Sequence, residues 1–295
     1  MLELSNPGQQ QMQLHGMQRL TDSDAPEVLD FLSRRPLHTF IMASFIRQHG
    51  VISAAHRGAF YGYRNASGAL EGVALIGHLI LVETNSNVAM QSFAKIAQNS
   101  LTANTVLGEW SKVGEFLDCY SQGADTPRLL HRQLLMERSQ PISLPEQIGA
   151  LRLANLEDLD LVVPVHAQLA FDESGVNPLE VDPTGFRERC AKRIEAQKVW
   201  VVAQDGQLQF KADVVAETPE VTYLEGVYVG AEQRGQGFGT RCLAQMTNEL
   251  LRQSDSVCLF ANLTNHAAQK CYKKAGYTLR EYYDSLYLKQ YAVTV

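Results

Sequence analysis

The chain has 295 residues, of which 45% are hydrophobic and 20% are charged, and its formal net charge is −6. This length suffices for two domains of ordinary size, and the composition is that of a soluble globular protein. The charge argues against nucleic acid or an anionic membrane surface as a partner, and the absence of a signal-peptide pattern and of any apolar run of eighteen residues predicts no membrane-spanning segment.

The cysteines indicate neither a disulfide framework nor a metal site. Their number is odd and none has the CxxC spacing that zinc sites use. We therefore expect free thiols, a reducing cytoplasmic location and no metal. The five residues are Cys119, Cys190, Cys242, Cys258 and Cys271.

The first half of the chain alternates helical and extended segments up to a proline-containing break. We expect helical structure at 25–48, strands at 59–65 and 70–83, a helix at 87–98, a strand at 105–110, a helix near 113–120 and a strand at 131–138. Pro141 and Pro145 then fall between two apolar stretches. They predict a linker at 141–149 between a domain of residues 1–140 and a domain of residues 150–295.

The second half has clearer element boundaries. Asp182 followed by Pro183 is typical of a helix N-cap and first helical position, whereas Pro164 should kink its helix or begin a new turn. The expected elements are a strand at 148–154, helices at 155–171 and 182–197, three meander strands at 199–204, 208–218 and 221–229 with an Asp205-Gly206 turn, a helix after Gly239, a strand at 257–263, a helix at 266–276, and a closing β-pair around Asp284-Ser285.

A glycine-rich bend separates the strand at 221–229 from the following helix. Gly235, Gly237 and Gly239 stand at alternate positions, and glycine permits positive φ and close approach to a ligand. Strand, glycine turn and helix together favour an anion bound by backbone N–H groups at the helix N-terminus. A Walker loop is excluded because GxxxxGK[ST] does not occur, and the dinucleotide pattern GxGxxG fails at Thr240. The pattern [Q/R]xxGx[G/A] does fit, starting at Arg234.

Two signatures together carry a resemblance to a known family. The first is the loop from Arg234 to Gly239, and the second is NxxAxxxYxxxG[F/Y], matched by Asn265, Ala268, Tyr272, Gly276 and Tyr277. In this order, about residues 150–295 resemble the GNAT superfamily of coenzyme A-dependent N-acyltransferases. The resemblance implies an α/β (α+β) fold with a mixed, mostly antiparallel sheet flanked by helices, in which two neighbouring parallel strands splay apart.

The resemblance also implies how acetyl-CoA, the cosubstrate, would bind. Its pantetheine arm would lie between the splayed strands and bond to backbone groups of 227–229, as an added strand would. The pyrophosphate would rest on the N–H groups of 234–240, aided by the helix dipole. Arg234 either adds positive charge there or is a surface residue. The implied cofactor-binding residues are Val227, Tyr228, Val229, Arg234, Gly235, Gln236, Gly237, Phe238, Gly239, Thr240, Asn265 and Tyr272.

Two residues are candidates for the chemistry of acyl transfer. Tyr272 matches the position of the family's usual general acid, which would protonate the leaving thiolate; alternatively it is a core tyrosine. Asn265 either bonds to pantetheine or caps the next helix. Glu225 lies where family members often carry an acidic residue near the reacting amine, and is our candidate for the base that removes the amine proton. Alternation places Glu225 on the face of Val227 unless a bulge intervenes.

Other groups remain candidates for the base or for binding the acceptor. The segment 171–185 reads as a loop over the site, and its carboxylates either bind a cationic amine or are simply solvated. Tyrosines near the C-terminus either line that pocket or pack in the sheet. The alternative base candidates are His166, Asp172, Glu173, Asp182 and Glu281, and the tyrosines are Tyr282, Tyr283 and Tyr287.

The first half shares the element order of the second but has "TNSN", without glycine, where the anion loop would stand. It therefore resembles the degenerate half of a tandem GNAT protein, which would wall the acceptor site or form an interface; a homodimer stays open. The leading interpretation is an N-acetyltransferase that transfers acetyl from acetyl-CoA to a primary amine of a small molecule or peptide. The alternatives are an acyl-CoA-binding sensor without turnover and a partner-binding protein on the same scaffold.

Overall fold

A computed structural model describes residues 16–120, 129–144 and 146–288. These residues form two compact units. Unit 1 takes residues up to Arg34, Gln48–Leu130 and the chain from Ser285, and unit 2 takes Arg35–Arg47 and His131–Asp284. The boundaries of these units differ from the predicted domain bounds of 1–140 and 150–295. The division into two domains at those bounds stays a prediction.

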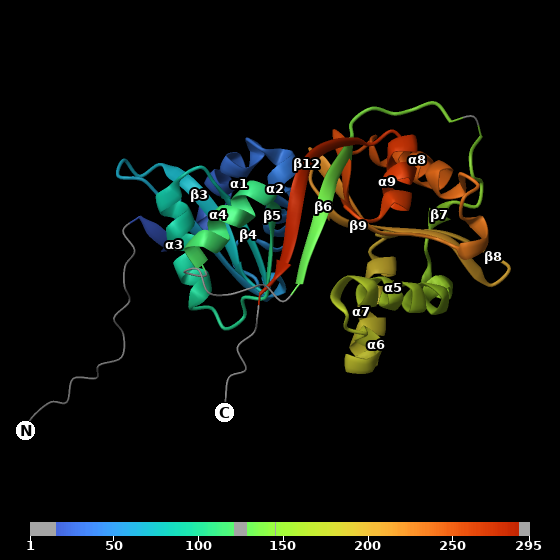
Figure 1. The fold of residues 1–295 in the computed structure, drawn as a ribbon, viewed down its shortest axis with the longest axis horizontal. Helices are drawn as coiled ribbons and strands as arrows, with labels where there is room; N and C mark the ends of the chain where they lie inside the picture. The colour runs from blue at the N-terminus through green and yellow to red at the C-terminus, as the bar shows by residue number, and fades with distance from the viewer. Residues whose placement is uncertain (1–15, 121–128, 145, 289–295) are drawn as a thin grey trace, which may run out of the picture. The chain divides into compact units, whose positions relative to one another are not determined.

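The chain uses one order of elements twice (Figure 1). The first pass is β1 (Met17–Arg19), α1 (Ala25–Ser33), α2 (Pro36–His49), β2 (Gly58–Arg64), β3 (Leu70–Gly77), β4 (Leu79–Thr84), α3 (Asn87–Gln98), β5 (Thr105–Glu109), α4 (Trp110–Tyr120) and β6 (Leu129–Arg138). The second pass is β7 (Arg152–Leu153), α5 (Leu159–Ser174), α6 (Pro178–Val181), α7 (Pro183–Glu195), β8 (Val199–Gln204), β9 (Gln207–Glu217), β10 (Val221–Val229), α8 (Phe238–Leu250), β11 (Ser256–Asn262), α9 (His266–Lys274) and β12 (Thr278–Tyr287). Except for the single turn of α6, the two passes match element by element, as the outline of the sequence predicted.

In unit 1 the sheet order is β1-β2-β3-β4-β5, and only β4 and β5 pair in parallel. Apolar faces of α3 and α4 pack on this sheet through Phe93, Val113 and Phe116, which contact Ile76 and Ile80 in one core cluster. This burial fixes unit 1 as a sheet with helices packed on it, the layered arrangement that hides the apolar face of each element.

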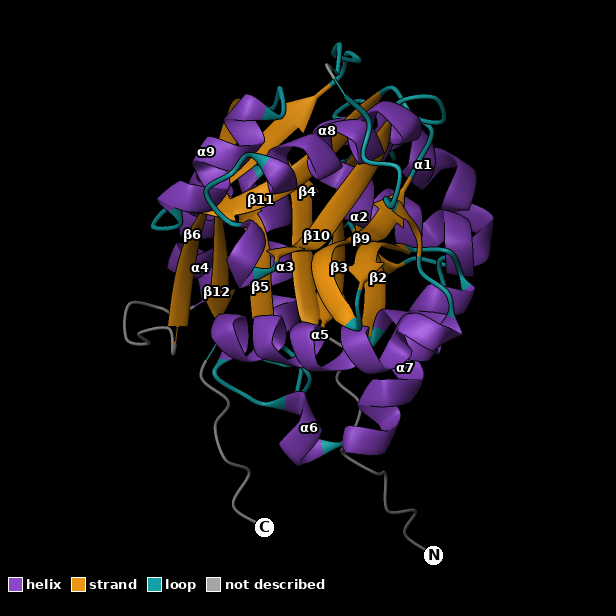
Figure 2. Cartoon of the chain, turned by 90° about the vertical axis from the view of Figure 1, so that its right-hand side faces the viewer, coloured by secondary structure: helices purple, strands orange, loops and turns teal. Residues whose placement is uncertain are grey.

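In unit 2 the sheet order is β12-β6-β11-β10-β9-β8-β7, and β10 and β11 form its parallel pair. Helices α8 and α9 pack on one face and α5 and α7 on the other, as Figures 1 and 2 show. Strand alternation explains both faces: Val202 belongs to the cluster under α8 with Leu243, while its neighbour Val201 belongs to the cluster under α5 with Val162. The sheet of unit 2 is therefore covered on both faces.

Two elements from the first half of the sequence belong to unit 2. Strand β6 pairs antiparallel with β11. Helix α2 packs on the sheet through Phe40, whose ring lies 4.9 Å from that of Tyr223, and through His38, whose Nδ1 is 2.9 Å from the hydroxyl of Tyr283. Unit 2 is therefore incomplete without residues that precede the predicted linker.

Several local expectations can now be compared with the structure. Asp182 caps α7 by accepting a hydrogen bond from the N–H of Gly185, with Pro183 in the first turn, as predicted. Pro164 lies inside α5. The expected β-pair around Asp284-Ser285 is wrong, because β12 runs straight through both residues. Neither residue has the positive φ that the tight primed hairpin turns require, and both are buried.

The segment predicted to be a linker packs against unit 2. The amide group of Asn248 on α8 bonds both the N–H and the carbonyl of Ile142 at 3.1 and 2.9 Å. Ile142, Leu144 and Ile148 also pack on the core beneath α8. These contacts hold the chain against α8 rather than leaving it as an exposed spacer.

Candidate functional site

Strands β10 and β11 separate after a short parallel pairing. They pair only from Val221 with Ser256 to Leu224 with Leu259, although β10 continues to Val229 and β11 to Asn262. The N–H of Gly230 donates to Gln209 on β9, so alternation turns the peptide group of Val229 away from β9, toward the gap. The last part of β10 therefore has the open edge on which an extended ligand can add as a strand.

A β-bulge lies at the point where the strands separate. Glu225 stands opposite Asp213 and Tyr228 stands opposite Lys211, so β10 has one residue more than β9 in this interval. Gly226 has a φ of +61°, which glycine adopts without the penalty of a Cβ atom. The bulge shifts the alternation of side chains after Glu225. The prediction that Glu225 and Val227 share a face was made only for a strand without such a bulge.

A short 3-10 turn at Ala231–Gln233 connects β10 to the glycine bend, which leads directly into α8. Gly235 and Gly237 have φ values of +78° and +77°, so both positions favour glycine for conformational reasons. Gly239 has another reason: a Cβ there would lie 2.4 Å from Cγ2 of Val229. It lets the first turn of α8 approach strand β10.

The backbone N–H groups of this bend face no protein acceptor. In the described part of the chain, the N–H groups of residues 235–240 donate to no carbonyl in a turn or cap, and the N-cap Gly237 has no capping side chain. The corresponding connection of unit 1 is two residues long, and Ser86 caps α3 by accepting from the N–H of Ala89. The bend of unit 2 thus retains the donors that an anion requires, together with the positive end of a helix dipole.

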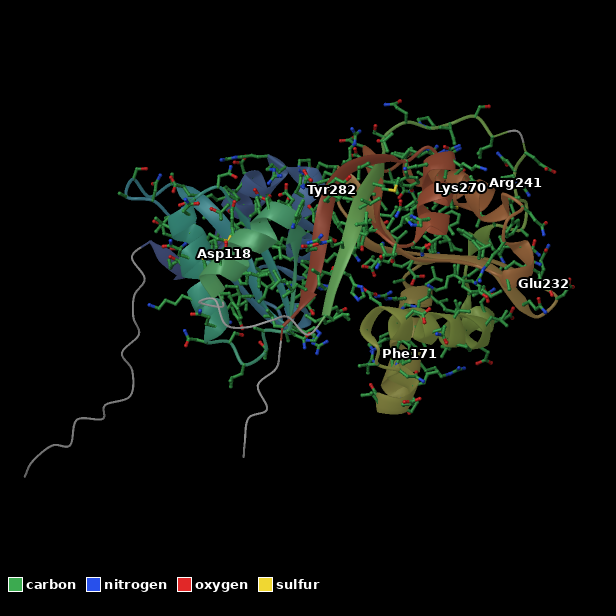
Figure 3. All side chains as sticks on the ribbon, in the orientation of Figure 1. Asp118, Phe171, Glu232, Arg241, Lys270 and Tyr282 are labelled. Atoms are coloured by element: carbon green, nitrogen blue, oxygen red, sulfur yellow. The ribbon has the colours of Figure 1, made fainter. Side chains whose placement is uncertain are left out.

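One arginine beside the bend escaped the sequence analysis. Arg241 lies in the first turn of α8 (Figure 3), and its Nη1 is 4.0 Å from the place where a Cβ on Gly237 would be. Its Nε is buried and has no hydrogen-bond partner among the described residues. A buried donor without a partner is rare and costs free energy, so this atom fits an anionic ligand at the bend. The signal in the sequence was a basic residue directly after the glycine pattern.

Other side chains of the bend brace its backbone. Arg234 donates from Nε to the carbonyl of Val229 at 2.9 Å, and Gln236 donates to the carbonyl of Glu232. Thr240 donates to Sγ of Cys271 on α9. These bonds fix the shape of the loop, as expected if the residues act mainly through their backbones.

A cavity of about 460 Å³ lies next to the gap between β10 and β11. Four predicted site residues line it together, namely Glu225, Val227, Asn265 and Tyr272. Its further lining residues are His131, Gln133, His166, Leu169, Ala170, Asp172, Glu173, Arg193, Lys211, Asp213, Tyr223, Leu224, Gly226, Leu259, Phe260, Asn262 and Thr264. The side chain of Tyr228 instead lines a second cavity, of about 400 Å³, beside α5.

Tyr272 and Asn265 come from α9 and the turn before it. Tyr272 is 7% exposed, and burial raises its pKa above the ordinary tyrosine value, so its hydroxyl stays protonated at neutral pH. Asn265 caps α9 by accepting from the N–H of Ala268 at 3.0 Å, which is one of its two predicted roles. A protonated hydroxyl in this cavity is able to donate a proton.

Glu225 is exposed to the cavity and is held by a neighbour on its own strand. The hydroxyl of Tyr223 donates to Oε1 of Glu225 at 2.6 Å. Burial, followed by the charge of Glu225, raises the pKa of Tyr223 well above its ordinary value, so this tyrosine remains a donor. The bond fixes the Glu225 carboxylate without taking up its second oxygen.

Among the alternative candidates, Glu173, His166 and Asp172 line the cavity from α5, and Asp172 accepts a hydrogen bond from Gln168. Glu173 keeps contact with solvent, yet the surrounding protein raises its pKa, first by desolvation and then through the charge of Glu225. Asp182 caps α7 and pairs with an arginine, and Glu281 accepts from a backbone N–H; neither lines the cavity. Nor does any of the three tyrosines Tyr282, Tyr283 and Tyr287.

A buried charged group forms the end of the cavity near the bulge. Lys211 and Asp213 are 0% and 1% exposed, and their Nζ and Oδ1 atoms are 2.7 Å apart. Oδ2 of Asp213 lies 3.4 Å from both His166 Nδ1 and Arg193 Nη1. Desolvation and the charge of Lys211 lower the pKa of His166 to about 4, so it is neutral. The sequence signal, overlooked above, was a lysine and an aspartate two positions apart inside an apolar strand.

Comparisons with known proteins bear on this architecture. Residues 207–285 match the family model described as FR47-like protein. An acetyltransferase from the GNAT family of Colwellia psychrerythraea is 15% identical, with a TM-score of 0.54 over 92% of this chain and 99% of that chain. A GCN5-related N-acetyltransferase from Sphaerobacter thermophilus is 15% identical, with a TM-score of 0.55 over 92% and 94%. A tandem GNAT protein from the clavulanic acid biosynthesis pathway is 11% identical, with a TM-score of 0.57 over 92% and 98%. No curated protein matches the sequence.

The fold and the splayed strands are those of GNAT proteins. The resemblance to the GNAT superfamily that the two signatures predicted is confirmed, as is the mixed, mostly antiparallel sheet flanked by helices. The chain has the GNAT fold, and its segment 207–285, which contains both the glycine bend and Tyr272, is similar to FR47-like proteins. At these identities the solved structures establish the fold and leave the activity to the site.

Metal-binding clusters and membrane-spanning helices are two further features that could indicate a function. Within residues 16–120, 129–144 and 146–288, no three His, Cys, Asp or Glu residues gather in a way that suits a metal ion. None of the described helices has the length and apolar character that crossing a bilayer requires. The predicted cytoplasmic location and homodimer stay predictions.

Proposed function

We propose that the protein is an acetyl-CoA-dependent N-acetyltransferase whose acceptor is a primary amine of a small molecule or peptide. The observation that carries this proposal is the run of backbone N–H groups at residues 235–240 that have no acceptor among the described residues, beside a cavity that holds Glu225 and Tyr272. An anion site and two groups suited to proton transfer thus lie on neighbouring segments of one fold.

Residues of the bend and of β10 would hold the cosubstrate. The N–H groups of 235–240 and Nε of Arg241 suit its pyrophosphate, because these donors have no acceptor in the part of the chain that the structure describes. The open edge of β10 at Val227 and Val229 suits the amide groups of the pantetheine arm. When bound, acetyl-CoA supplies an activated acyl group with a thiolate as leaving group.

Glu225 would take the proton that the acceptor amine loses. An amine with a pKa of about 10.4 is neutral in about one molecule per few thousand at pH 7, so a base or a water path is required. Glu225 is open to the cavity and fixed by Tyr223. Glu173, which lines the same cavity, would attract the cationic form of the amine before it loses its proton.

Tyr272 would protonate the departing thiolate, and a backbone N–H would stabilise the carbonyl oxygen. Tyr272 is buried and protonated in the cavity wall. The N–H of Val229 is turned toward the gap by the alternation of β10, which makes it our candidate for the donor to the developing oxyanion. Since a thiol has a pKa of about 8.5, the thiolate needs only modest help.

The proposal is tested by binding and turnover measured on the same preparation. We expect calorimetry to show one acetyl-CoA site, and thiol release to accelerate with at least one member of a panel of primary amines, amino acids and peptides. Binding without release by any amine would indicate a sensor instead of an enzyme. Absence of binding to the folded protein would leave only a GNAT scaffold with another role.

A further inference from the structure

The cavity beside the splayed strands has two ends of opposite charge. Helix α5 lays His166 and Glu173 along it, seven residues and therefore about 10 Å apart at 1.5 Å per residue. At the Glu173 end, the charge of Glu225 is close enough to act on Glu173. At the His166 end lie Lys211, Asp213 and Arg193.

The His166 end carries one positive charge more than it neutralises. Lys211 and Arg193 are both cations, whereas Asp213 is the single carboxylate between them. Lys211, 2.7 Å from Asp213, already balances the single negative charge of that carboxylate. The positive charge of Arg193, 3.4 Å from Asp213, is therefore left over. His166 adds no charge at neutral pH because its pKa is lowered.

The donors at this end also exceed the acceptors. Lys211 is 0% exposed, and among the described residues its Nζ has no hydrogen bond of acceptable geometry in spite of the nearby Asp213 oxygen. An ammonium has three donors and a guanidinium five. Oδ1 of Asp213 likewise has no hydrogen bond of acceptable geometry among the described residues, so Lys211 and Asp213 serve each other as buried counter-ions. Arg193 is 40% exposed and keeps donors for a carboxylate in the cavity.

We propose that the acceptor is an amino acid-type zwitterion, whose carboxylate binds at Arg193 and whose reacting amine lies between Glu225 and Glu173. This inference rests on the proposed function and names its substrate class. The separation of Glu173 from His166 along α5 favours an amine several carbon atoms away from the carboxylate over an α-amine, and Glu225, which stands opposite Asp213 on β9, lies between the two ends. In the transfer, a bond forms between the amine nitrogen and the acetyl carbon, the carbon–sulfur bond breaks, the amine proton passes to Glu225 and the thiolate takes up a proton.

The test compares two amines that differ only in the carboxylate, 6-aminohexanoate and hexylamine. Thiol release should give a kcat/KM roughly 10- to 100-fold higher for 6-aminohexanoate, the range expected for a charged hydrogen bond. Arg193→Gln should remove most of this preference and leave the value for hexylamine within about twofold. The matched control Arg187→Gln lies on the same helix and pairs with Asp160 outside the cavity; it should leave both values unchanged.

Equal values for the two amines would overturn the inference, and so would an Arg193→Gln variant that slows both substrates alike. If neither amine is acetylated, these two acceptors give no support to the proposed acetyltransferase activity. Calorimetry with the CoA-saturated protein then tests the carboxylate site by binding alone. Binding of 6-aminohexanoate that exceeds that of hexylamine and is lost in Arg193→Gln would support the inference. Equal or absent binding of both would overturn it.

Discussion

The hydroxyl of Tyr223 donates a 2.6 Å hydrogen bond to the carboxylate of Glu225. The ring of Tyr223 lies between Phe40 of α2, at 4.9 Å, and Phe260 of β11, at 5.5 Å. Helix α2 comes from the first half of the chain but belongs to unit 2. The first half of the sequence therefore supplies Phe40, which packs against the tyrosine that holds Glu225, the proposed base. Strand β6 adds His131 and Gln133 to the cavity wall.

Replacing Glu225 by Gln tests its role as a base. We expect kcat/KM at pH 7 to fall roughly 100-fold, within the range of general base catalysis. The loss should shrink as the pH rises, because the neutral fraction of the amine grows about tenfold per pH unit below its pKa. The measurement is a pH profile of thiol release.

Glu249→Gln on α8 is the matched control, since Glu249 pairs with Arg252 at the surface. This variant should keep the profile of the unchanged protein. A Glu225→Gln variant with an unaltered rate would exclude Glu225 as the base and direct attention to Glu173.

A carboxylate placed in the glycine bend should weaken the binding of acetyl-CoA. Gly235→Asp adds a negative charge where a Cβ meets no atom within 4 Å, and repulsion of about 1 to 4 kcal/mol corresponds to roughly fivefold to nine-hundredfold in Kd. Gly235→Asn, which also tolerates the positive φ, should lose much less. Calorimetry with acetyl-CoA measures all variants.

Gly206 provides the control for conformation. It has a φ of +72° and equally open space, but lies in the β8–β9 turn. Gly206→Asp should leave the affinity unchanged. Equal affinities of the Asp and Asn variants at Gly235 would contradict an anion at the bend.

Substitution of two buried tyrosines distinguishes a catalytic role from a packing role. Tyr272→Phe should lower kcat by roughly 10- to 100-fold with little change in acetyl-CoA affinity, because it removes a proton donor. Tyr277 instead bonds with Thr247 at 2.7 Å. Tyr277→Phe should cost about 1 kcal/mol of stability and leave kcat unchanged. If Tyr272→Phe only lowers the melting temperature, Tyr272 is a core residue.

The close approach of α8 to β10 predicts that a smaller residue at position 229 compensates for a larger one at position 239. Gly239→Ala would place a methyl group 2.4 Å from Cγ2 of Val229, and such overpacking typically destabilises by about 1 to 3 kcal/mol. Val229→Ala removes the colliding atom, so the double variant should be more stable than additivity of the single changes allows. Denaturant unfolding measures all four proteins. Strict additivity would show that the two residues do not touch.

His166 predicts a loss of stability in weak acid. Its pKa in the folded protein is about 4, below the ordinary 6.5. Between these values the unfolded chain binds more protons, so stability falls as the pH is lowered through this window. At pH 5 the contribution is about 2 kcal/mol. His166→Asn should show less of this loss than the unchanged protein, and an NMR titration of the unchanged protein, assigned with this variant, should place His166 near pH 4. A midpoint near 6.5 would contradict the burial of this ring.

Local patterns predicted much of unit 2. Asp182 with Pro183 marked the start of α7, and the spacing of Asn265 and Tyr272 placed them on α9, because caps and helical periods depend on neighbours in sequence. The expected turn at Asp284-Ser285 was wrong because a polar pair signals a turn only when no neighbouring strand competes for its backbone. The pairing partners of a strand lie far away in sequence, and no local pattern contains them.

By itself, the sequence determined the class of fold, the glycine bend and the residues on the proposed catalytic elements, since backbone conformation and periodicity are local properties. Tertiary structure alone decided that α2 and β6 belong to unit 2, that Tyr223 holds Glu225, and that Lys211, Asp213, His166 and Arg193 meet at one end of a cavity. These are contacts between segments distant along the chain. They form because burying apolar surface and pairing charges bring such segments together, and the spacing of residues does not say which distant segments will meet.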